Sequence, residues 1–345
     1  MRNRLFAAAL LLTIVLLSGC GNKNRLTIYT WDEMFPQEIL RGFERETGIK
    51  INYVNFDENE TMLARLQAAR GSNYDLIIAD DYILEIVIKE GLAQKLDISK
   101  LSNYRNINPV YQGHFYDPGD EYTVPYGAGV QTIVYDPRQV NIPITGYDDL
   151  WDSSLANSVG IIGNFRVING MALKVLGESY NTNNLATIRS AGTLLSWLAP
   201  NIRLIMDDGL ADELLSGEIK ASVMYTSEVT TAKMENPGLE VVFPKEGIGF
   251  GIMAFFIPSG APNADAAHSF INYVLDAQRG ASCFEYLGYY STFSASDPLI
   301  SPAYKEFLTL PAGFNTDMEM IMNISPAAEE LHNLIWTEFR TTASR

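Results

Sequence analysis

The sequence has few of the residues and motifs on which most enzymes depend. Its three histidines, His114, His268 and His332, lie far apart and lack the spacing of a metal site. It contains no phosphate-binding loop, no Gly-x-Ser-x-Gly turn between a strand and a helix, and no His-Glu-x-x-His motif. Absent motifs do not exclude every enzyme, but no feature supports one. We therefore predict a protein without catalytic residues, cofactor or bound metal.

Basic residues are also scarce. The 345 residues include 25 Lys and Arg against 41 Asp and Glu, which gives a formal net charge of −16. This balance disfavours nucleic acid and anionic membrane surfaces as partners, and it is compatible with a cationic ligand. The acids are scattered along the chain rather than gathered in one run, as is typical of a folded domain.

The one long apolar run lies at the start of the chain. It extends from Leu5 to Leu17 and is shorter than the roughly 18 residues that span a bilayer as a helix. Arg2 and Arg4 precede it and Leu17-Ser18-Gly19-Cys20 follows it, so residues 1–19 are predicted to be a signal peptide. The alternatives are an ordinary secretory signal with a chance cysteine and a transmembrane anchor.

The Leu-Ser-Gly-Cys tetrapeptide resembles a bacterial lipobox, in which the cysteine becomes the lipidated first residue of the mature protein. We therefore predict an extracytoplasmic protein, in the periplasm or on the outer face of the cell membrane, that is anchored by a lipid at Cys20. Residues 20–25 form a short polar tether. Only Cys283 then remains, so no intramolecular disulfide is possible. We interpret Cys283 as a buried thiol, with a reactive nucleophile as the alternative.

The first part of the mature chain alternates between strand and helix patterns. β-branched and aromatic residues predict strands at 26–31, 49–56 and 75–79. Helical spacing predicts a helix over 36–48, and Asp57 to Glu60 resembles the capping box of a second one. This order indicates an α/β fold with helices on both faces of a mainly parallel sheet.

In such sheets, ligands bind beyond the carboxyl ends of the strands. Two segments stand at such ends: Trp31-Asp32-Glu33 after the first strand and Asp80-Asp81-Tyr82 after the third. Each combines carboxylates with an aromatic ring. Later segments continue the alternation, with strands predicted at 159–162, 221–225, 240–244 and 252–257 and helices at 171–176, 185–198, 264–275 and 327–339. Asp207-Asp208-Gly209 is interpreted as a turn or helix start.

The chain resembles the periplasmic spermidine/putrescine-binding proteins of ABC transporters from about Leu26 to its C-terminus. The order and spacing of the matching stretches carry the resemblance. They include Tyr29-Thr30-Trp31-Asp32-Glu33, Phe43-Glu44-Arg45-Glu46-Thr47-Gly48, Asn59-Glu60-Thr61-Met62, Tyr74-Asp75-Leu76-Ile77, Lys89-Glu90-Gly91-Leu92, Val124-Pro125-Tyr126, Asp149-Leu150-Trp151 and Phe243-Pro244-Lys245-Glu246-Gly247.

The resemblance implies a two-lobed, type II periplasmic-binding-protein-like fold with a ligand cleft between the lobes. Lobe one would comprise residues 25–127 and 252–297, and lobe two residues 128–251 and 298–345. The resemblance also implies a monomer that closes around a polyamine and delivers it to an ABC permease in the membrane. The alternatives are a different, non-polyamine solute and a ligand-sensing lipoprotein that serves a membrane receptor.

The residues of the family's ligand site are only partly present. Trp31, Glu33 and Tyr82 match family positions, and Tyr225 stands where a tryptophan is usual. Asn164 and Val167 stand where the family carries two carboxylates. Gly251 and Met253 stand where it carries a tryptophan and an aspartate, and this loss is the main reason to consider another solute.

Other acids stand nearby and could offset this loss. Asp32, Asp80 and Asp81 occupy positions where hydroxyl residues are usual, and Glu228 follows Tyr225 closely. Our hypothesis is that a cationic ligand is held mainly from lobe one. The alternatives are that Asp32 or Asp80 caps a helix, that Glu228 is a solvated surface residue and that Trp31 belongs to the core.

Overall fold

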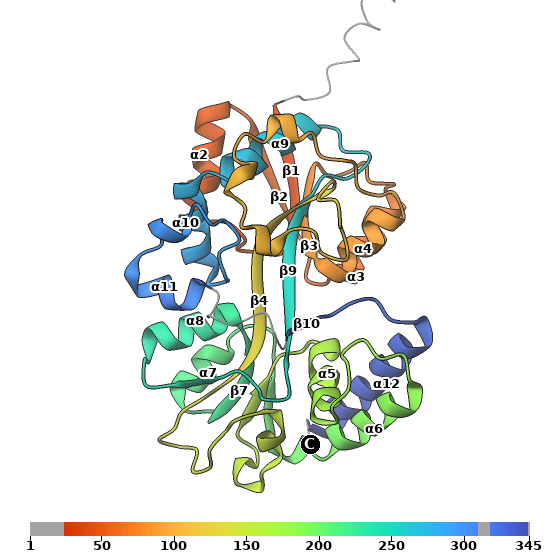
Figure 1. The fold of residues 1–345 in the computed structure, drawn as a ribbon, viewed down its shortest axis with the longest axis vertical. Helices are drawn as coiled ribbons and strands as arrows, with labels where there is room; N and C mark the ends of the chain where they lie inside the picture. The colour runs from red at the N-terminus through yellow and green to blue at the C-terminus, as the bar shows by residue number, and fades with distance from the viewer. Residues whose placement is uncertain (1–23, 310–317, 344–345) are drawn as a thin grey trace, which may run out of the picture.

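The computed structural model describes residues 24–309 and 318–343. Figure 1 shows two packed halves, one above the other, joined by long strands that run through both. The predicted signal peptide and Cys20 lie outside the described residues. Within the described part of the chain, no helix combines the length and the hydrophobicity needed to cross a membrane.

The first half is built on the predicted alternation of strands and helices. Strand β1 (Arg25–Thr30) pairs in parallel with β2 (Lys50–Asn55) and with β3 (Leu76–Asp80). Helices cover this sheet on both sides, and they are α2 (Gln37–Thr47), α3 (Asn59–Ala68), α4 (Asp81–Lys89), α9 (Ala264–Val274) and α10 (Ala277–Leu287).

The predicted capping box at the start of α3 is wrong. Glu58 occupies the N-cap position, and no side chain caps the helix there. The Asn59 amide instead contacts Asp80 at the end of β3, a tertiary contact that satisfies a half-buried carboxylate.

Two strands pass from the first half into the second. Strand β4 (Thr123–Tyr135) is buried over its full length and lies antiparallel to β9 (Ile248–Phe256). From Gln131 onward, β4 pairs instead with β7 (Ala221–Tyr225) of the lower half (Figure 1). The sheet order is β2-β1-β3-β9-β4-β7-β5-β6.

The second half surrounds the far ends of these strands. Its strands are β5 (Val159–Ile161), β6 (Ile202–Ile205), β7 and β8 (Glu240–Val242). Its helices are α5 (Phe165–Val175), α6 (Leu185–Ser196), α7 (Leu210–Ser216), α8 (Thr226–Glu235) and α12 (Pro326–Ala343). Helix α11 (Pro302–Leu308) packs against α8 and α10, and β10 (Met318–Met320) pairs with β9.

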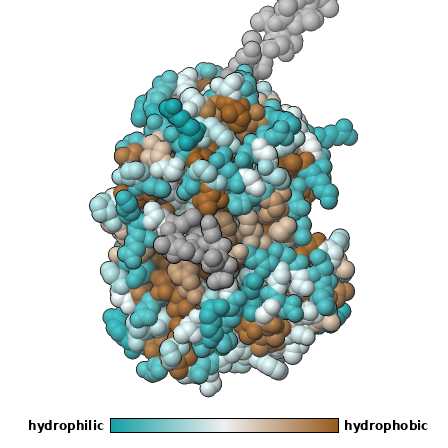
Figure 2. Space-filling model, in the orientation of Figure 1, coloured by the Kyte–Doolittle hydropathy of each residue, from teal (hydrophilic) through white to brown (hydrophobic). Residues whose placement is uncertain are grey.

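Each half has a hydrophobic core of its own. Phe43, Phe255 and Phe270 belong to a cluster in the first half, whereas Leu195, Val223 and Trp336 belong to one in the second. Polar residues cover most of both halves of the visible face in Figure 2, and apolar residues gather near the waist between them. The predicted two-lobed α/β fold is thereby confirmed, and we call the halves lobe one and lobe two.

Cys283 is fully buried in the lobe-one cluster. Burial raises the pKa of its thiol to about 12, so the thiol stays protonated at neutral pH and does not act as a nucleophile. The interpretation of Cys283 as a core residue agrees with this placement.

Candidate functional site

Asp80 lies at the centre of a polar cluster on lobe one. It is the last residue of β3, and its Oδ2 accepts a hydrogen bond from Asn59 Nδ2 at 2.8 Å. The Tyr82 hydroxyl donates to Glu60 Oε1 at 3.1 Å and lies 3.4 Å from the same Asn59 nitrogen. Burial, with a smaller effect of Glu60, raises the pKa of Asp80 to about 6, and the Asn59 hydrogen bond opposes this rise.

The Asp80 side chain does not cap a helix. Asp80 occupies the N-cap position of α4, but its carboxylate accepts no hydrogen bond from that helix. The alternative that it is only a cap therefore does not apply, and the carboxylate has one described partner, an amide.

Asp81 has a different position from its neighbour. It is only 3% exposed, and its two oxygens accept hydrogen bonds from the backbone N–H groups of Tyr82 and Ile252. Burial and the charge of Asp80 raise the pKa of its carboxyl well above the ordinary value. Asp81 thus joins the start of α4 to β9, and its oxygens face the protein.

Tyr225 brings lobe two toward the same region. It ends β7, and its side chain lies near Asn164, which caps α5 by accepting from the N–H groups of Arg166 and Val167. Burial chiefly raises the pKa of Tyr225, and the negative charges of Asp80 and Asp207 add to this effect. Tyr225 therefore lies near carboxylates of both lobes.

The sequence reasoning did not select Tyr289, Asp207 or Asp208, which the structure brings near Asp80 and Tyr225. Burial raises the pKa of Tyr289 to about 12, with contributions from Asp80 and Asp208. A Cβ atom at Gly129 would lie 2.8 Å from the Tyr289 ring, so the ring needs glycine at this point of β4. Asp207 and Asp208 follow β6, and the rule that selects carboxyl ends of strands could have found them.

The Glu228 carboxylate forms hydrogen bonds within lobe two. Its carboxylate accepts hydrogen bonds from the backbone N–H groups of Gly209 at 3.4 Å and Ala211 at 2.7 Å, at the start of α7. The positive end of a helix is a favourable place for such a charge. The sequence prediction of Glu228 as a ligand residue remains untested, and its two oxygens already have partners.

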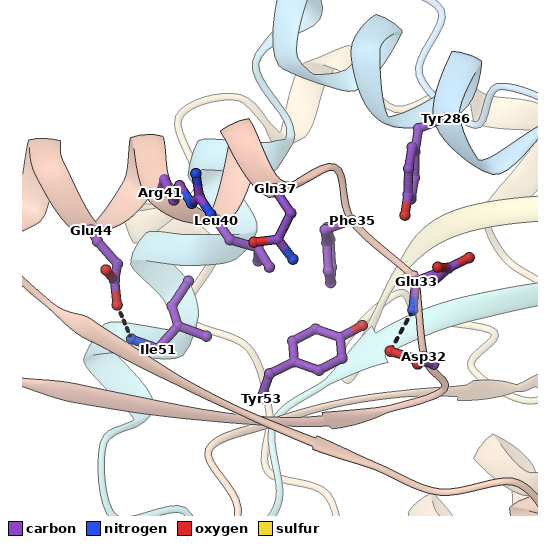
Figure 3. Close-up of a pocket in the computed structure, with 10 residues that line it drawn as sticks. All are labelled: Asp32, Glu33, Phe35, Gln37, Leu40, Arg41, Glu44, Ile51, Tyr53 and Tyr286. Atoms are coloured by element: carbon purple, nitrogen blue, oxygen red, sulfur yellow. Dashed lines mark hydrogen bonds between the residues drawn. The ribbon is translucent and has the colours of Figure 1, made fainter.

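Asp32 and Glu33 line a separate pocket, of which Trp31 is not part. The Trp31 ring packs on Phe56 with centroids 4.9 Å apart, and Asp32 Oδ1 accepts from the Glu33 N–H. A pocket of about 500 Å³ opens beneath α2, as Figure 3 shows. Its lining comprises Asp32, Glu33, Phe35, Gln37, Leu40, Arg41, Glu44, Ile51, Tyr53 and Tyr286. Asp80 and Tyr225 are not part of this lining.

Of the three positions where the family's carboxylates are missing, Val167 and Met253 are closed to solvent, whereas Asn164 is partly exposed. Val167 is 2% exposed and Met253 is 9% exposed. The Met253 side chain fills the space above Gly127, where a Cβ atom would lie 2.9 Å from its Cε. Within the described residues, no group of three or more His, Cys, Asp or Glu could hold a metal ion.

These features define a two-lobed protein in which carboxylate and tyrosine side chains from both lobes lie near one another. The chain belongs to the bacterial extracellular solute-binding protein family, whose model matches residues 38–312. The predicted family resemblance is thereby confirmed, and the family consists of solute-binding proteins rather than enzymes.

Among its relatives is the spermidine/putrescine-binding periplasmic protein of Salmonella typhimurium, which is 34% identical over 87% of this chain and 86% of the relative. The spermidine/putrescine ABC transporter substrate-binding protein of Streptococcus pneumoniae has a similar structure, with a TM-score of 0.81 and 27% identity over 93% of this chain and 99% of that one. A lipoprotein of Treponema pallidum has a TM-score of 0.79 and 25% identity over 92% and 99% of the two chains.

Proposed function

We propose that this chain is a lipid-anchored solute-binding protein of an ABC importer and that it binds a polyamine or a related cationic solute. The single observation that carries this proposal is the environment of Asp80. Its half-buried carboxylate has an amide as its described partner and lies near the phenols of Tyr82, Tyr225 and Tyr289. A desolvated cation needs a partner charge, and ring faces add roughly 0.5–2 kcal/mol per ammonium group.

The names of the relatives support the same ligand class, since they are described as spermidine/putrescine-binding proteins. Trp31, Glu33, Asp80, Tyr82, Asn164 and Tyr225 remain our proposed ligand residues, and we add Tyr289 and Asp208. Asp207 is left out, because its Oδ1 accepts a hydrogen bond from the Gly163 N–H. Asp32 is proposed as an outer residue of the site. Asp81 and Glu228 act on the ligand only indirectly, because backbone groups occupy their oxygens.

We further propose that binding closes the two lobes about the strands they share, and that an ABC permease recognises the closed form of a monomer. Residues 25–127 and 252–297 would move against residues 128–251 and 298–345. Small-angle X-ray scattering tests this proposal, because closure should lower the radius of gyration when the ligand is added. An unchanged radius at saturating ligand would contradict closure.

The lipid anchor at Cys20 rests on the sequence alone and on the description of a structural relative as a lipoprotein. Mass spectrometry of the mature N-terminus should find a diacylglyceryl group on Cys20. The Cys20→Ser variant should leave the membrane fraction. An unmodified Cys20, or an N-terminus elsewhere, would refute the anchor.

Calorimetric titration of the mature chain with putrescine and spermidine tests the ligand. One-site binding at micromolar affinity, about −8 kcal/mol, would support the proposal. A second candidate is a solute without full positive charges, because Asn164, Val167 and Met253 replace family carboxylates. Folded, ligand-free protein that shows no heat with either amine would favour that candidate, or a ligand-sensing role with a different solute.

A further inference from the structure

Residues 318–325 lead from the waist of the molecule into α12, and we call them the strap. Strand β10 forms the first part of the strap and pairs with β9. Figure 1 shows the strap, in blue, passing below α3 and above α6 before it reaches α12. The strap therefore lies beside elements of both lobes.

Polar side chains of lobe two hold most of the strap. Lys174 and Asn181 donate hydrogen bonds to Glu319 at 2.6 and 3.0 Å. Asn181 Oδ1 also accepts from the Met322 N–H at 2.7 Å, and the buried Arg166 donates to the Met322 carbonyl at 3.1 Å. Because these bonds join the strap to α5 and to the segment that follows it, the strap should move with lobe two.

Asn323 reaches from the strap to lobe one. Its Nδ2 donates hydrogen bonds to the backbone carbonyl of Tyr82 at 2.9 Å and to Glu85 Oε2 at 2.7 Å. A carbonyl and a carboxylate only accept hydrogen bonds, so the amide must turn its NH₂ group toward α4. One of the two bonds thus holds the backbone of Tyr82, a proposed ligand residue.

This contact differs from another one between the lobes. The Thr230 hydroxyl donates to the Gly288 carbonyl at 2.8 Å, and Thr230 is only 2% exposed. A Cβ atom at Gly288 would lie 3.1 Å from Ser227 Cα, so the two lobes are closely packed there. Asn323 is exposed, and water can replace its partners when they separate. The lobes should therefore part more easily at Asn323 than at Thr230.

We infer that Asn323 is a latch, which stabilises the closed form of the protein and positions Tyr82 without touching the ligand. When the lobes separate, the strap stays with lobe two and both hydrogen bonds are lost. A bond that exists only in the binding-competent form raises the fraction of that form, and the apparent affinity rises with it. The inference rests on the proposed closure and goes beyond it, because it assigns part of the affinity to a residue outside the ligand site.

The test is calorimetry and stopped-flow fluorescence on the mature chain, with putrescine as the probe. Asn323→Ala should weaken binding about five- to tenfold, as for two solvent-exposed hydrogen bonds of which one is charge-assisted. The loss should appear in the dissociation rate, because the ligand enters an open form in which the latch is already broken. The association rate should stay within about twofold of the wild type.

Two further variants separate the latch from a general effect on the strap. Asn183→Ala is the matched control, since Asn183 Oδ1 accepts an exposed hydrogen bond from the strap residue Ser325 at 2.6 Å within lobe two. Its affinity should stay within about twofold. Glu85→Ala should weaken binding in the wild type but have no further effect in Asn323→Ala, because the two residues act as a pair.

Each other outcome has a definite meaning. If the wild type binds putrescine and Asn323→Ala binds equally well, or if Asn183→Ala weakens binding as much, the latch is refuted and the proposed function stands. A loss confined to the association rate also refutes the latch. If the wild type binds neither putrescine nor spermidine, the proposed function fails, and small-angle scattering of ligand-free protein then decides on the latch. A larger radius of gyration in Asn323→Ala than in the wild type would support it, and equal radii would overturn it.

Discussion

The two lobes use acids at comparable junctions in opposite ways. Asp80 stands where β3 leads into α4 on lobe one, and Glu228 stands in the first turn of α8, after β7, on lobe two. The Glu228 carboxylate is occupied by two backbone N–H groups of a neighbouring helix start. The Asp80 carboxylate has one amide partner and a raised pKa.

The difference shows what makes an acid at a strand end available to a ligand. On lobe one, Asp81 accepts the nearby backbone N–H groups of Tyr82 and Ile252, so Asp80 is free of that role. On lobe two, α7 begins without a cap from its own side chains, and Glu228 supplies one. Availability therefore depends on which other side chain satisfies the helix terminus.

The largest expected effect is the loss of ligand binding in Asp80→Asn. Removal of a half-buried charge that pairs with the ligand should weaken polyamine binding about 100-fold. The same change should raise the free energy of unfolding of ligand-free protein by about 1 kcal/mol at pH 7.5, because the raised pKa marks an unfavourable charge. Calorimetry and urea denaturation measure the two effects, with the exposed Asp57→Asn as control. Binding within threefold of the wild type would refute the role of Asp80.

A change of pH is expected to have a smaller effect, both on the stability of the ligand-free protein and on its affinity for the ligand. The pKa of Asp80 in the folded, ligand-free protein is about 6, above the ordinary value of 3.8. The folded state therefore binds this proton more tightly than the unfolded state, and the stability of ligand-free protein should fall as pH rises from about 4 to 6. The amines stay charged throughout, so affinity should drop by up to about tenfold per pH unit below 6.

The Asp80→Asn variant is the control for this pH dependence. This variant should still bind weakly, because Glu60 and Tyr82 remain. Its affinity should change little between pH 5 and 7, because the titrating carboxylate of Asp80 is absent. A wild-type affinity that is constant from pH 7 to pH 5 would show that Asp80 does not face the ligand.

Asn164→Asp should sharpen the comparison by restoring a carboxylate to lobe two. Asp is as good an N-cap as Asn, so α5 should keep its cap and the stability should change little. Because Asn164 contacts Tyr225 in the proposed cleft, the added charge should strengthen spermidine binding about three- to tenfold. Calorimetry with spermidine measures this gain, and weaker binding would show that the lobe-two wall faces an uncharged part of the ligand.

The fold was largely predictable where local patterns decide it. Alternating strands and helices placed β1, β2, β3 and α2 within a few residues of their observed bounds. The long strand β4 was missed, because Pro125, Gly127 and Gly129 interrupt a strand pattern. The two glycines are needed by tertiary contacts, since Met253 packs on Gly127 and Tyr289 on Gly129. Such contacts join residues more than 100 positions apart, and no local period records them.

The candidate site was likewise predictable only where a local rule or the family resemblance applied. The rule for strand ends selected Asp80 and Tyr82, and the family resemblance selected Tyr225. Tyr289 follows a helix, so the rule could not select it. Asn59 was assigned to a local capping motif, and its contact with Asp80, 21 residues away, depends on how α3 packs beside β3. Sequence pattern located the acids, but it could not show which of them the backbone already uses.

The smallest effect on binding, and the sharpest contrast with Asp80, is expected from Glu228→Gln. The neutral amide keeps the shape of the side chain but weakens two hydrogen bonds to the start of α7, so the free energy of unfolding should fall by about 1 kcal/mol. Ligand affinity should stay within about twofold of the wild type. Urea denaturation and calorimetry measure both, and Glu235→Gln at the other end of α8 serves as a control that should change neither. A Glu228→Gln protein with unchanged stability and binding weakened more than fivefold would make Glu228 a ligand residue, and both lobes would then hold the cation through carboxylates.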